Sequence, residues 1–590
     1  MTKAGKGKDQ TPAVSAPSED LEKLRQQLAE LERAPKLGLV WRDIPEDVEI
    51  LLRDEIPVLI HEAALDIVGK LPSDKSHVLI EGDNLHALHV LQATHRGAID
   101  VIYIDPPYNR GGDFRYNDKL IDKENTWRHS AWLSFMEKRL RLGAELLKAT
   151  GVMFISIDFV EIARLRLLCE QVFGEKHIVA TISVVNNLKG RSDDKHIATA
   201  HEYLLVCARD ESQLQLKGFG LDDVKISEYK LSDNKGPWKP VGLQKTGKSS
   251  LRADRPNLFY PIYWNEKTDK LSLERMAKSD IKILPLFTDG REGNWRWGRD
   301  TFLEKADTEL VVKRQKRGPI ISVKMRMHGD DGEERTLKPK SIWLDPKYDS
   351  GSATRLLTQL LGGKVFDNPK PLEFIKDVLL ISTSEDAVVL DFFAGTGTTL
   401  HAVADLNAAD GGTRHCILVT NNENDICREV TQPRLKAVLR GGWADGKHAP
   451  LPGSMTFYKT GVIKRLKSPD RMRTEIARHT VDLIALKEGA GITVSRTADL
   501  AVLYGLKKTI AVVAGLDPNH RKLCAIAEKT VRKGDHKTAY LFTWSEQGVE
   551  KETAELWPDW EVQPLPAEML AALRRNAPQL RLFSRDRNAQ

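Results

Sequence analysis

Short apolar runs alternate along the chain with longer segments in which apolar residues recur every three or four positions. The runs HVLIEGD, AIDVIYID and GVMFISID, which begin at His77, Ala98 and Gly151, are predicted to be strands, and a helical pattern follows each of them. HEYLLVCAR (201–209) is predicted to be a further strand. Strands that alternate with helices favour a parallel, doubly wound α/β sheet.

This alternation stops between residues 210 and 340, where Gly, Pro and Asp clusters separate many short β-like pieces. It returns at Pro371 with a predicted helix over 371–382, the strand AVVLDFF, a glycine turn and a helix from Thr398. A separate piece with the strand-like runs TIAVVAG and AYLFTW follows residue 446. The order fits one α/β domain that an insertion interrupts and a small C-terminal α/β domain follows.

The N-terminus has a different pattern. Its first residues are rich in Lys, Pro, Ser and Ala, which is typical of a disordered tail, and four leucines then recur at helical spacing: Leu21, Leu24, Leu28 and Leu31. The expected boundaries are 1–18 for the tail, 19–75 for an N-terminal helical arm, 76–209 for the first half of the core, 210–345 for the insertion, 346–445 for the second half of the core and 446–590 for the C-terminal domain.

Composition excludes several classes of protein. The net charge of +6 is small for 590 residues, no apolar run reaches the roughly 18 residues of a membrane span, and the N-terminus lacks the layout of a signal peptide. The five cysteines are scattered and form no C-x-x-C pair, so neither a disulfide framework nor a metal site is predicted. We expect a reduced, cytoplasmic protein that does not contact a membrane.

Basic residues are enriched in the interrupting segment. Residues 186–340 carry 31 Lys and Arg against 24 Asp and Glu, an excess of +7 that exceeds that of the whole chain. Such an excess suits a surface that contacts phosphates. KRQKR (313–317) is the densest run, and the other basic residues are more dispersed: Lys189, Arg191, Lys195, Lys245, Lys248, Arg252 and Arg255. Aromatic residues interleave, most of them expected in a core: Trp238, Tyr263, Trp264, Trp295 and Trp297.

The glycine turn after AVVLDFF is a first candidate for chemistry. Gly395 and Gly397 would let the backbone bend sharply, and the following helix N-terminus offers free N–H groups to an anion. Glu423 lies 26 residues after Gly397, just past the next predicted strand, where an acidic side chain can bind the two hydroxyls of a ribose. The turn is no phosphate-binding P-loop, since no G-K-[ST] follows. A nucleoside cofactor and a turn needed only for packing remain equally compatible with the pattern.

The second candidate is the turn Asp105-Pro106-Pro107-Tyr108, which follows an apolar strand. The prolines fix φ and remove two N–H donors, so the turn presents acceptors beside an aromatic ring. An exocyclic amine on a base is a poor nucleophile because its lone pair is delocalised into the ring. The Asp105 carboxylate and the Pro106 carbonyl could accept both amine hydrogens and direct that lone pair at a methyl donor, while Tyr108 stacks on the base. Such a base must leave the duplex.

These features together resemble a known family. The D-P-P-Y turn precedes the F-x-G-x-G turn, and Asp391 lies 286 positions after Asp105. This permuted order resembles the β class of DNA amino-methyltransferases, above all the modification subunits of type III restriction–modification systems. LIEGDNLHAL, HSAWLSFMEKRLRL, CEQVFGE, SGSATRLL, DNPKP and LDFFAGTGTT add to the resemblance, which spans roughly residues 36–460.

The resemblance implies a fold, a cofactor and a set of site residues. The fold would be a Rossmann-like methyltransferase core with an inserted target-recognition domain, and the cofactor S-adenosylmethionine. Asp105, Pro106, Pro107 and Tyr108 would hold the target amine. The cofactor would be bound by Asp83, Lys370, Asp391, Phe393, Gly395, Gly397, Thr398 and Glu423. Asp83 is equally compatible with a helix N-cap and Lys370 with a surface lysine, and Asn421-Asn422 before Glu423 departs from the family pattern.

The implied function is methylation of N6 of adenine in double-stranded DNA. Methylation of N4 of cytosine, RNA as the substrate and a non-catalytic DNA-recognition subunit remain alternatives, although D-P-P-Y favours adenine and an intact Asp105 favours catalysis. The family also implies a homodimer that associates with a restriction subunit, since no helicase P-loop or nuclease motif is evident in the sequence. A solitary modification enzyme is the alternative.

Overall fold

The structure is a computed structural model. It describes residues 41, 45–52, 55–71, 76–111, 115–116, 119–120, 127–192, 194–316, 318–329, 332–444, 446, 448–464, 469–490, 492–497, 499–505, 507–513, 519–541, 549 and 551–564. The predicted tail and the helix with the four leucines lie outside these residues.

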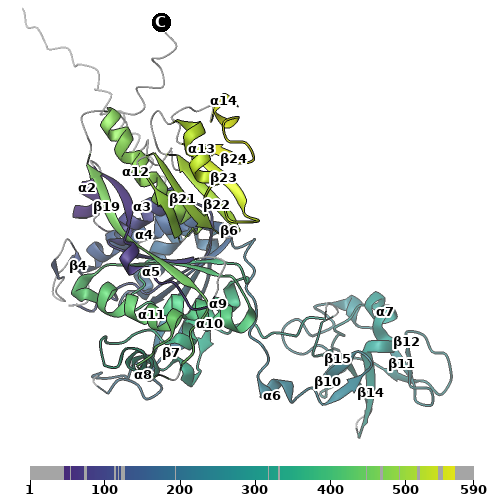
Figure 1. The fold of residues 1–590 in the computed structure, drawn as a ribbon. Helices are drawn as coiled ribbons and strands as arrows, with labels where there is room; N and C mark the ends of the chain where they lie inside the picture. The colour runs from purple at the N-terminus through teal and green to yellow at the C-terminus, as the bar shows by residue number, and fades with distance from the viewer. Residues whose placement is uncertain are drawn as a thin grey trace, which may run out of the picture. The chain divides into compact units, whose positions relative to one another are not determined.

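Ten of the described strands form one sheet (Figure 1). Their order across the sheet is β1 (Glu55–His61), β19 (Ser454–Lys464), β2 (Ser76–Glu81), β18 (His415–Thr420), β17 (Val388–Asp391), β3 (Ile99–Ile104), β6 (Leu147–Ile157), β8 (His201–Ala208), β7 (Ile178–Val185) and β16 (Ile342–Trp343). The six strands from β19 to β6 are parallel to one another. The centre of the sheet therefore has the predicted doubly wound α/β character.

The expectation of a parallel sheet is wrong at β8, which pairs antiparallel with both β6 and β7. The reason is the connection: β7 runs into β8 through residues 186–200 with no intervening helix, and a chain that turns straight back pairs antiparallel. As a result, β8 begins at the edge where β3 and β6 end.

Helices cover both faces of this sheet. One face packs on α3 (Asn84–Thr94) and α4 (Arg128–Leu146), and its core includes Ile102 and Ile104. Tyr103 points to the other face, where its ring meets Phe374 of α9 (Leu372–Ser382) edge-on at 6.2 Å. The remaining helices of these layers are α5 (Ile162–Phe173), α8 (Ser350–Leu361), α10 (Thr398–Asp410) and α11 (Gln432–Arg440).

Two expected domain boundaries differ from the structure. The expected helical arm (19–75) contains the short helix α2 (Asp47–Leu52) but also the strand β1, and the expected C-terminal domain (446–590) begins with β19. These two strands pair with each other antiparallel, and β19 pairs with β2, so both belong to the main sheet. Met455, Phe457 and Tyr458 of β19 are buried there, and this burial holds the strand in the core.

A second sheet follows β19 in the chain. Its described strands have the order β20 (Ile492–Arg496), β21 (Leu500–Gly505), β22 (Lys508–Val513), β23 (His536–Leu541) and β24 (Glu561–Pro564), with α12 (Pro469–Glu488), α13 (His520–Glu528) and α14 (Lys551–Ala554) beside them. Leu483 and Ile484 of α12 join the core that lies under α3 and α4. The C-terminal sheet is therefore packed on the α/β core through α12.

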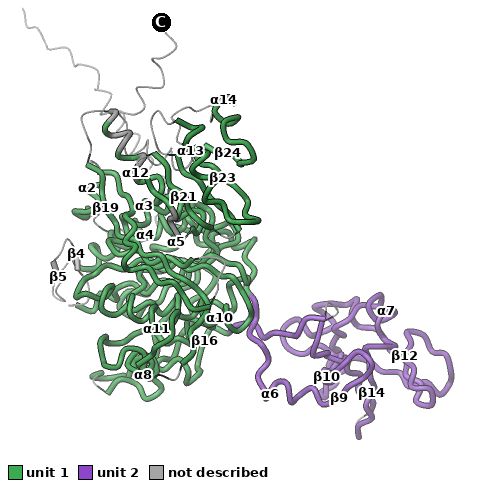
Figure 2. The backbone as a smooth tube through the Cα atoms, in the orientation of Figure 1, with its two compact units in different colours: residues 1–216, 340–590 green, residues 217–339 purple. Residues whose placement is uncertain are grey.

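Residues 217–339 form a separate compact unit (Figure 2). One sheet has the order β14 (Leu310–Gln315), β15 (Gly318–Arg326), β10 (Gly236–Gly242) and β9 (Leu231–Asp233), and another the order β12 (Lys270–Ser272), β11 (Ile262–Asn265) and β13 (Ile281–Ile283); the helices are α6 (Asp223–Ile226) and α7 (Arg299–Glu309). The unit is shorter than the expected insertion (210–345), because β16 pairs with β7 in the main sheet.

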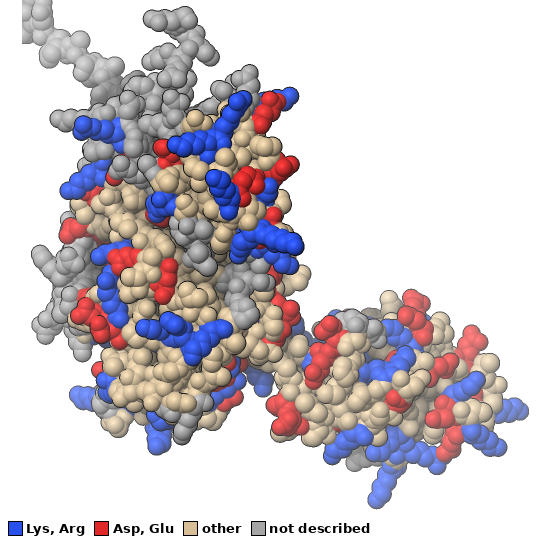
Figure 3. All heavy atoms as spheres, viewed as in Figure 1, with Lys and Arg blue, Asp and Glu red and all other residues tan. Residues whose placement is uncertain are grey.

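This unit has a buried aromatic core and an exposed hairpin that carries basic side chains. Trp264, Trp295 and Phe302 are buried in its core. The basic run at 313–316 lies on β14 where it turns into β15, and Lys313, Arg314 and Lys316 are exposed there. Figure 3 shows basic side chains on this projecting hairpin. The densest basic run of the sequence thus lies on an exposed β-hairpin.

Two further observations concern the described residues. None of their helices combines the length and apolar character needed to cross a membrane. All five cysteines are buried and free of disulfide bonds.

Candidate active site

Four connections meet at one edge of the main sheet. Because β2, β18, β17 and β3 are parallel neighbours, the residues that follow them lie side by side. Asp83 follows β2, Glu423 follows β18, the glycine turn follows β17 and Asp105 follows β3. The Gly82 N–H donates to the Thr420 carbonyl at 2.9 Å, and that of Ala394 to the Val419 carbonyl at 3.0 Å. Ligands of open α/β sheets bind at this edge.

The D-P-P-Y turn is anchored from two sides. The indole N–H of Trp132, on α4, donates to the Pro107 carbonyl at 2.7 Å. Asn109, which has a left-handed φ of 57°, donates its side-chain N–H to Glu161 at 2.6 Å. Both anchoring side chains, Trp132 and Glu161, are fully buried. The turn is thereby held rigidly, with the Pro107 carbonyl already used as an acceptor.

A lysine connects the D-P-P-Y turn to a second acid. Lys370 Nζ lies 3.2 Å from Asp105 Oδ1 and donates to Tyr108 Oη at 2.6 Å and to Glu202 Oε2 at 2.8 Å. Tyr108 donates its O–H to the same Glu202 oxygen at 2.9 Å. We call Asp105, Tyr108, Glu202 and Lys370 the acid–lysine cluster. It fixes the tyrosine ring next to the carboxylate.

In the acid–lysine cluster, burial and the neighbouring charges shift the pKa values of Asp105 and Lys370 in opposite directions. Burial raises the pKa of Asp105, while Lys370 acts to lower it. Burial acts to lower the pKa of Lys370, but Asp105 and Glu202 raise it above its usual value. Burial and the two acids hold the pKa of Tyr108 well above its usual range. At neutral pH the cluster therefore holds a cationic lysine and a neutral tyrosine.

The family resemblance implied that Lys370 binds the cofactor, and Glu202 was not among the predicted site residues. In the structure the Lys370 ammonium lies on the D-P-P-Y side, whereas its carbonyl accepts from Thr398 Oγ1 at 3.5 Å. Lys370 thus connects the two turns. Glu202 lies at the start of β8 and is only 5% exposed. Its place in HEYLLVCAR, as an acid at the head of an apolar strand, was the available signal.

The glycine turn is shaped largely by its own side chains. Gly395 and Gly397 have φ of 49° and 77°. Asp391 accepts from the Phe393 N–H at 3.0 Å and from Thr399 Oγ1 at 2.5 Å, and burial raises its pKa to about 7. Both carboxyl oxygens of Asp391 are therefore used inside the turn, which makes Asp391 a residue that shapes the turn.

The start of α10 is braced from behind. Arg434, on α11, is 2% exposed and donates to Thr396 Oγ1 at 2.9 Å and to Thr398 Oγ1 at 2.8 Å. Gly397 offers no side chain to cap α10. At Gly395 an added Cβ would meet only Phe393 O, at 3.9 Å. The turn thus leaves open space beside Gly395 and presents the first N–H groups of α10, which suits an anionic ligand group.

Asp83 and Glu423 flank this turn. Asp83 Oδ1 accepts from the Leu85 N–H at 2.7 Å, so this residue does cap α3, and its Oδ2 lies 3.6 Å from the buried guanidinium of Arg139. Glu423 begins a short 3-10 turn and is partly exposed, and its Oε2 accepts from Asn421 at 3.4 Å. Both acids lie at the edge where the sequence analysis expected them.

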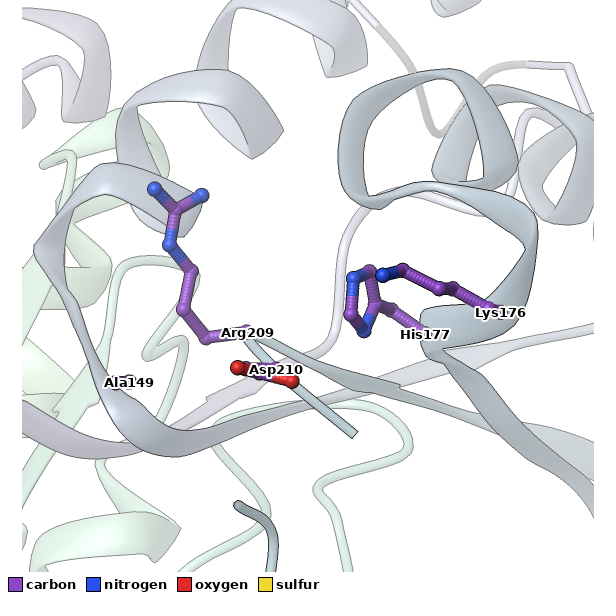
Figure 4. Close-up of a pocket in the computed structure, with 5 residues that line it drawn as sticks. All are labelled: Ala149, Lys176, His177, Arg209 and Asp210. Atoms are coloured by element: carbon purple, nitrogen blue, oxygen red, sulfur yellow. The ribbon is translucent and has the colours of Figure 1, made fainter. Parts of the chain in front are cut away.

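The structure also contains a pocket elsewhere. It has a volume of about 350 Å³ and is lined by Ala149, Lys176, His177, Arg209 and Asp210 (Figure 4). Ala149 lies near the start of β6 and Arg209 follows the end of β8, so the pocket is at the edge opposite Asp105. It is separate from the acid–lysine cluster.

Comparison with known proteins gives a consistent result. A family model described as DNA methylase matches residues 99–429. The type III restriction–modification enzyme EcoPI Mod subunit of Escherichia phage P1 is 36% identical over 378 residues, 59% of this chain and 58% of that protein. The type II methyltransferase M.KpnI of Klebsiella pneumoniae is 38% identical over 359 residues, 60% of this chain and 82% of that protein. The chain thus spans less than two thirds of the EcoPI Mod subunit.

Among solved structures, the PvuII DNA methyltransferase, titled cytosine-N4-specific, is similar with a TM-score of 0.33 and 11% identity. The match covers 64% of this chain and 93% of that one. The fold assignment rests on the strand order of the main sheet.

Proposed function

Since the chain belongs to the DNA methylase family whose model matches more than half of it, we propose that it transfers a methyl group from S-adenosylmethionine to N6 of adenine in double-stranded DNA. One observation carries the proposal: the D-P-P-Y turn and the glycine turn follow adjacent parallel strands, β3 and β17. An amine held by Asp105 would lie next to a cofactor held at the turn.

The proposed chemistry depends on acceptors that are already in position. Asp105 and the Pro106 carbonyl accept the two hydrogens of the target amine, which directs its lone pair outward. Tyr108, fixed by Glu202, stacks on the flipped base. The new N–C bond would form as the S–CH3 bond of the bound cofactor breaks, S-adenosylhomocysteine would leave, and one proton of the methylated amine would pass to Asp105 or to solvent. S-adenosylmethionine supplies the methyl group when it is bound.

The cofactor would be held around the glycine turn. The N-terminus of α10 suits its carboxylate, the open space at Gly395 admits close approach, and Glu423 suits the ribose hydroxyls. Asp83 has one carboxyl oxygen that does not cap α3 and would face the adenine ring. Asp391 and Thr398 would act by shaping the turn.

Mass spectrometry of nucleosides tests the choice of base. DNA incubated with the purified chain and S-adenosylmethionine is expected to yield N6-methyladenine, and long-read sequencing of the same DNA would return the methylated motif. N4-methylcytosine without N6-methyladenine would refute the choice of adenine. Methylation of RNA but not DNA would refute the choice of substrate.

A glycine substitution tests the site of the cofactor. In Gly397→Ala the residue keeps a left-handed φ, and the new Cβ meets Thr431 Cγ2 at 3.1 Å and Leu435 Cδ2 at 3.3 Å. We expect S-adenosylmethionine to bind at least about tenfold more weakly, because left-handed strain of about 1–2 kcal/mol is added where the ligand docks. Isothermal titration calorimetry measures the change.

Gly411→Ala is the matched control. Gly411 caps the other end of α10 with φ of 73°, and an added Cβ there meets nothing within 4 Å. Both variants carry the backbone strain, but only Gly397→Ala is expected to lose cofactor affinity. An equal loss in the two would mean that the glycine turn acts through stability alone.

We also propose that residues 217–339 recognise the target sequence and that the chain works as a homodimer with a restriction subunit. The first proposal is supported by the basic β14–β15 hairpin, and the second by similarity to proteins named Mod subunits. Light scattering that finds only the 66.3 kDa monomer would refute the dimer. Deletion of residues 217–339 that leaves the methylated motif unchanged would refute the recognition role.

A further inference from the structure

The loop between β7 and β8 borders the acid–lysine cluster. Residues 186–200 leave the end of β7 and enter β8 at His201, one residue before Glu202. Ile157, at the end of β6, pairs with Tyr203. Glu202, the second residue of β8, accepts from the Tyr108 hydroxyl at 2.9 Å. The β7–β8 loop therefore borders the place where the target base would enter.

Hydrogen bonds across the loop give it a defined shape. At its base the N–H groups of Asn186 and Asn187 both donate to the Ala200 carbonyl at 3.2 Å. Further out, the Arg191 N–H donates to the Thr199 carbonyl at 3.0 Å, and the Thr199 N–H to the Asp194 carboxylate at 2.7 Å. The two arms of the loop are thus pinned to each other.

The segment Lys195-His196-Ile197-Ala198 is exposed on this loop. Ile197 is 85% exposed, the highest value among the large apolar side chains of the described residues, and Leu188 on the other arm is 59% exposed. Phe159, two residues past the end of β6, is 62% exposed and follows Asp158, which pairs with Arg110. Scattered exposed apolar residues are ordinary, but these three lie on segments that follow β6 and β7, whose ends share the edge that carries Asp105.

Basic side chains accompany the apolar ones. Lys189 and Lys195 are exposed and Arg191 is partly exposed, on the same loop. A cation beside a projecting apolar side chain suits a duplex, whose phosphates attract the cation and whose base stack accepts the apolar wedge.

We propose that Ile197 enters the DNA duplex beside the target and fills the space that the flipped base leaves, while Lys189, Arg191 and Lys195 hold the phosphates around it. This inference rests on the proposed methylation of duplex DNA. A base that leaves the stack opens an apolar gap, and a side chain that fills the gap keeps the base from returning.

The test compares two duplexes that carry the methylated motif. In one the target adenine is paired with thymine, and in the other it faces an abasic site, so that flipping costs less. Ile197→Ala is expected to lower kcat/KM roughly tenfold on the paired duplex and less than about twofold on the abasic one. With 2-aminopurine in place of the target, the rise in fluorescence on binding should fall in the variant.

Val68→Ala is the matched control. Val68 is 68% exposed and follows Ile67, which bridges to Met455 near the start of β19, at the opposite edge of the sheet. This variant should match the wild type on both duplexes. If Ile197→Ala lowered kcat/KM equally on both duplexes, or on neither, the proposal that Ile197 enters the duplex would be wrong. A wild-type protein that methylates neither duplex would overturn the proposed function instead.

Discussion

Replacement of Asp105 by alanine is expected to lower kcat for methyl transfer by at least about 10²–10³-fold, the usual loss when a preorganised polar contact to the reacting group is removed. Asp105 is the carboxylate at the end of β3, and its role is to accept a hydrogen of the amine. The effect is expected to be large because the other carboxylate of the cluster, Glu202, is already engaged by the Tyr108 hydroxyl at 2.9 Å and the Lys370 ammonium at 2.8 Å. Transfer of a labelled methyl group to DNA measures the rate.

Asp405→Ala is a close control. Asp405 and Asp105 have side chains that are 32% and 29% exposed, and each pairs with one lysine, at 2.7 and 3.2 Å. Asp405 lies on α10, away from the D-P-P-Y turn, so its loss should leave the rate unchanged. Cofactor affinity should be close to that of the wild type in both variants. Undiminished transfer by Asp105→Ala would mean that the proposed mechanism is wrong.

The second large effect is expected at Lys370. Lys370→Met removes the cation that Asp105 and Glu202 share, and we expect kcat/KM to fall by about 10², the usual scale for loss of a preorganised polar group beside the reacting atoms. The pH dependence has a definite sign. Lys370 acts to lower the pKa of Asp105, so without it that pKa rises further, and the acid limb of the kcat/KM profile moves to higher pH.

Lys376→Met serves as its control. Lys376 lies six residues further along and pairs with Asp405 at 2.7 Å and Glu373 at 3.1 Å. It matches the charge arrangement of Lys370 without touching the D-P-P-Y turn. Its variant should keep the wild-type pH profile. If Lys370→Met lost S-adenosylmethionine binding and kept the acid limb, the lysine would be a cofactor contact, as the family resemblance implied.

The two turns could be predicted because each is a local pattern. An apolar strand that ends on Asp105, and another that ends on the Gly395–Gly397 turn, are visible in the sequence, and parallel strands bring their ends to one edge. Glu202 could not be placed in this way. Its position depends on the direction of β8, and the hydrophobic pattern of a buried strand is the same whether its neighbour is parallel or antiparallel.

The outer strands show a similar limit. β1 and β19 lie about 400 residues apart in the sequence yet pair over the whole length of β1, from Glu55 with Lys464 to His61 with Tyr458. Pairing between distant segments leaves no signature within either segment. The length of the insertion was overestimated for the same reason, because the partner of β16 is the distant strand β7.

The strand order also determines when the sheet can be completed during synthesis. Val101 of β3 pairs with Val389 of β17, 288 residues later, and Val78 of β2 pairs with Ile417 of β18, 339 residues later. At a translation rate of roughly 5–20 residues per second, β17 is synthesised roughly 15–60 s after β3, and β3 lacks this partner strand until then. Through that interval the nascent chain exposes apolar strand edges, and open edges of this kind promote aggregation. We therefore expect the strand order of this sheet to make the nascent chain dependent on chaperones while β17 and β18 are still to be made.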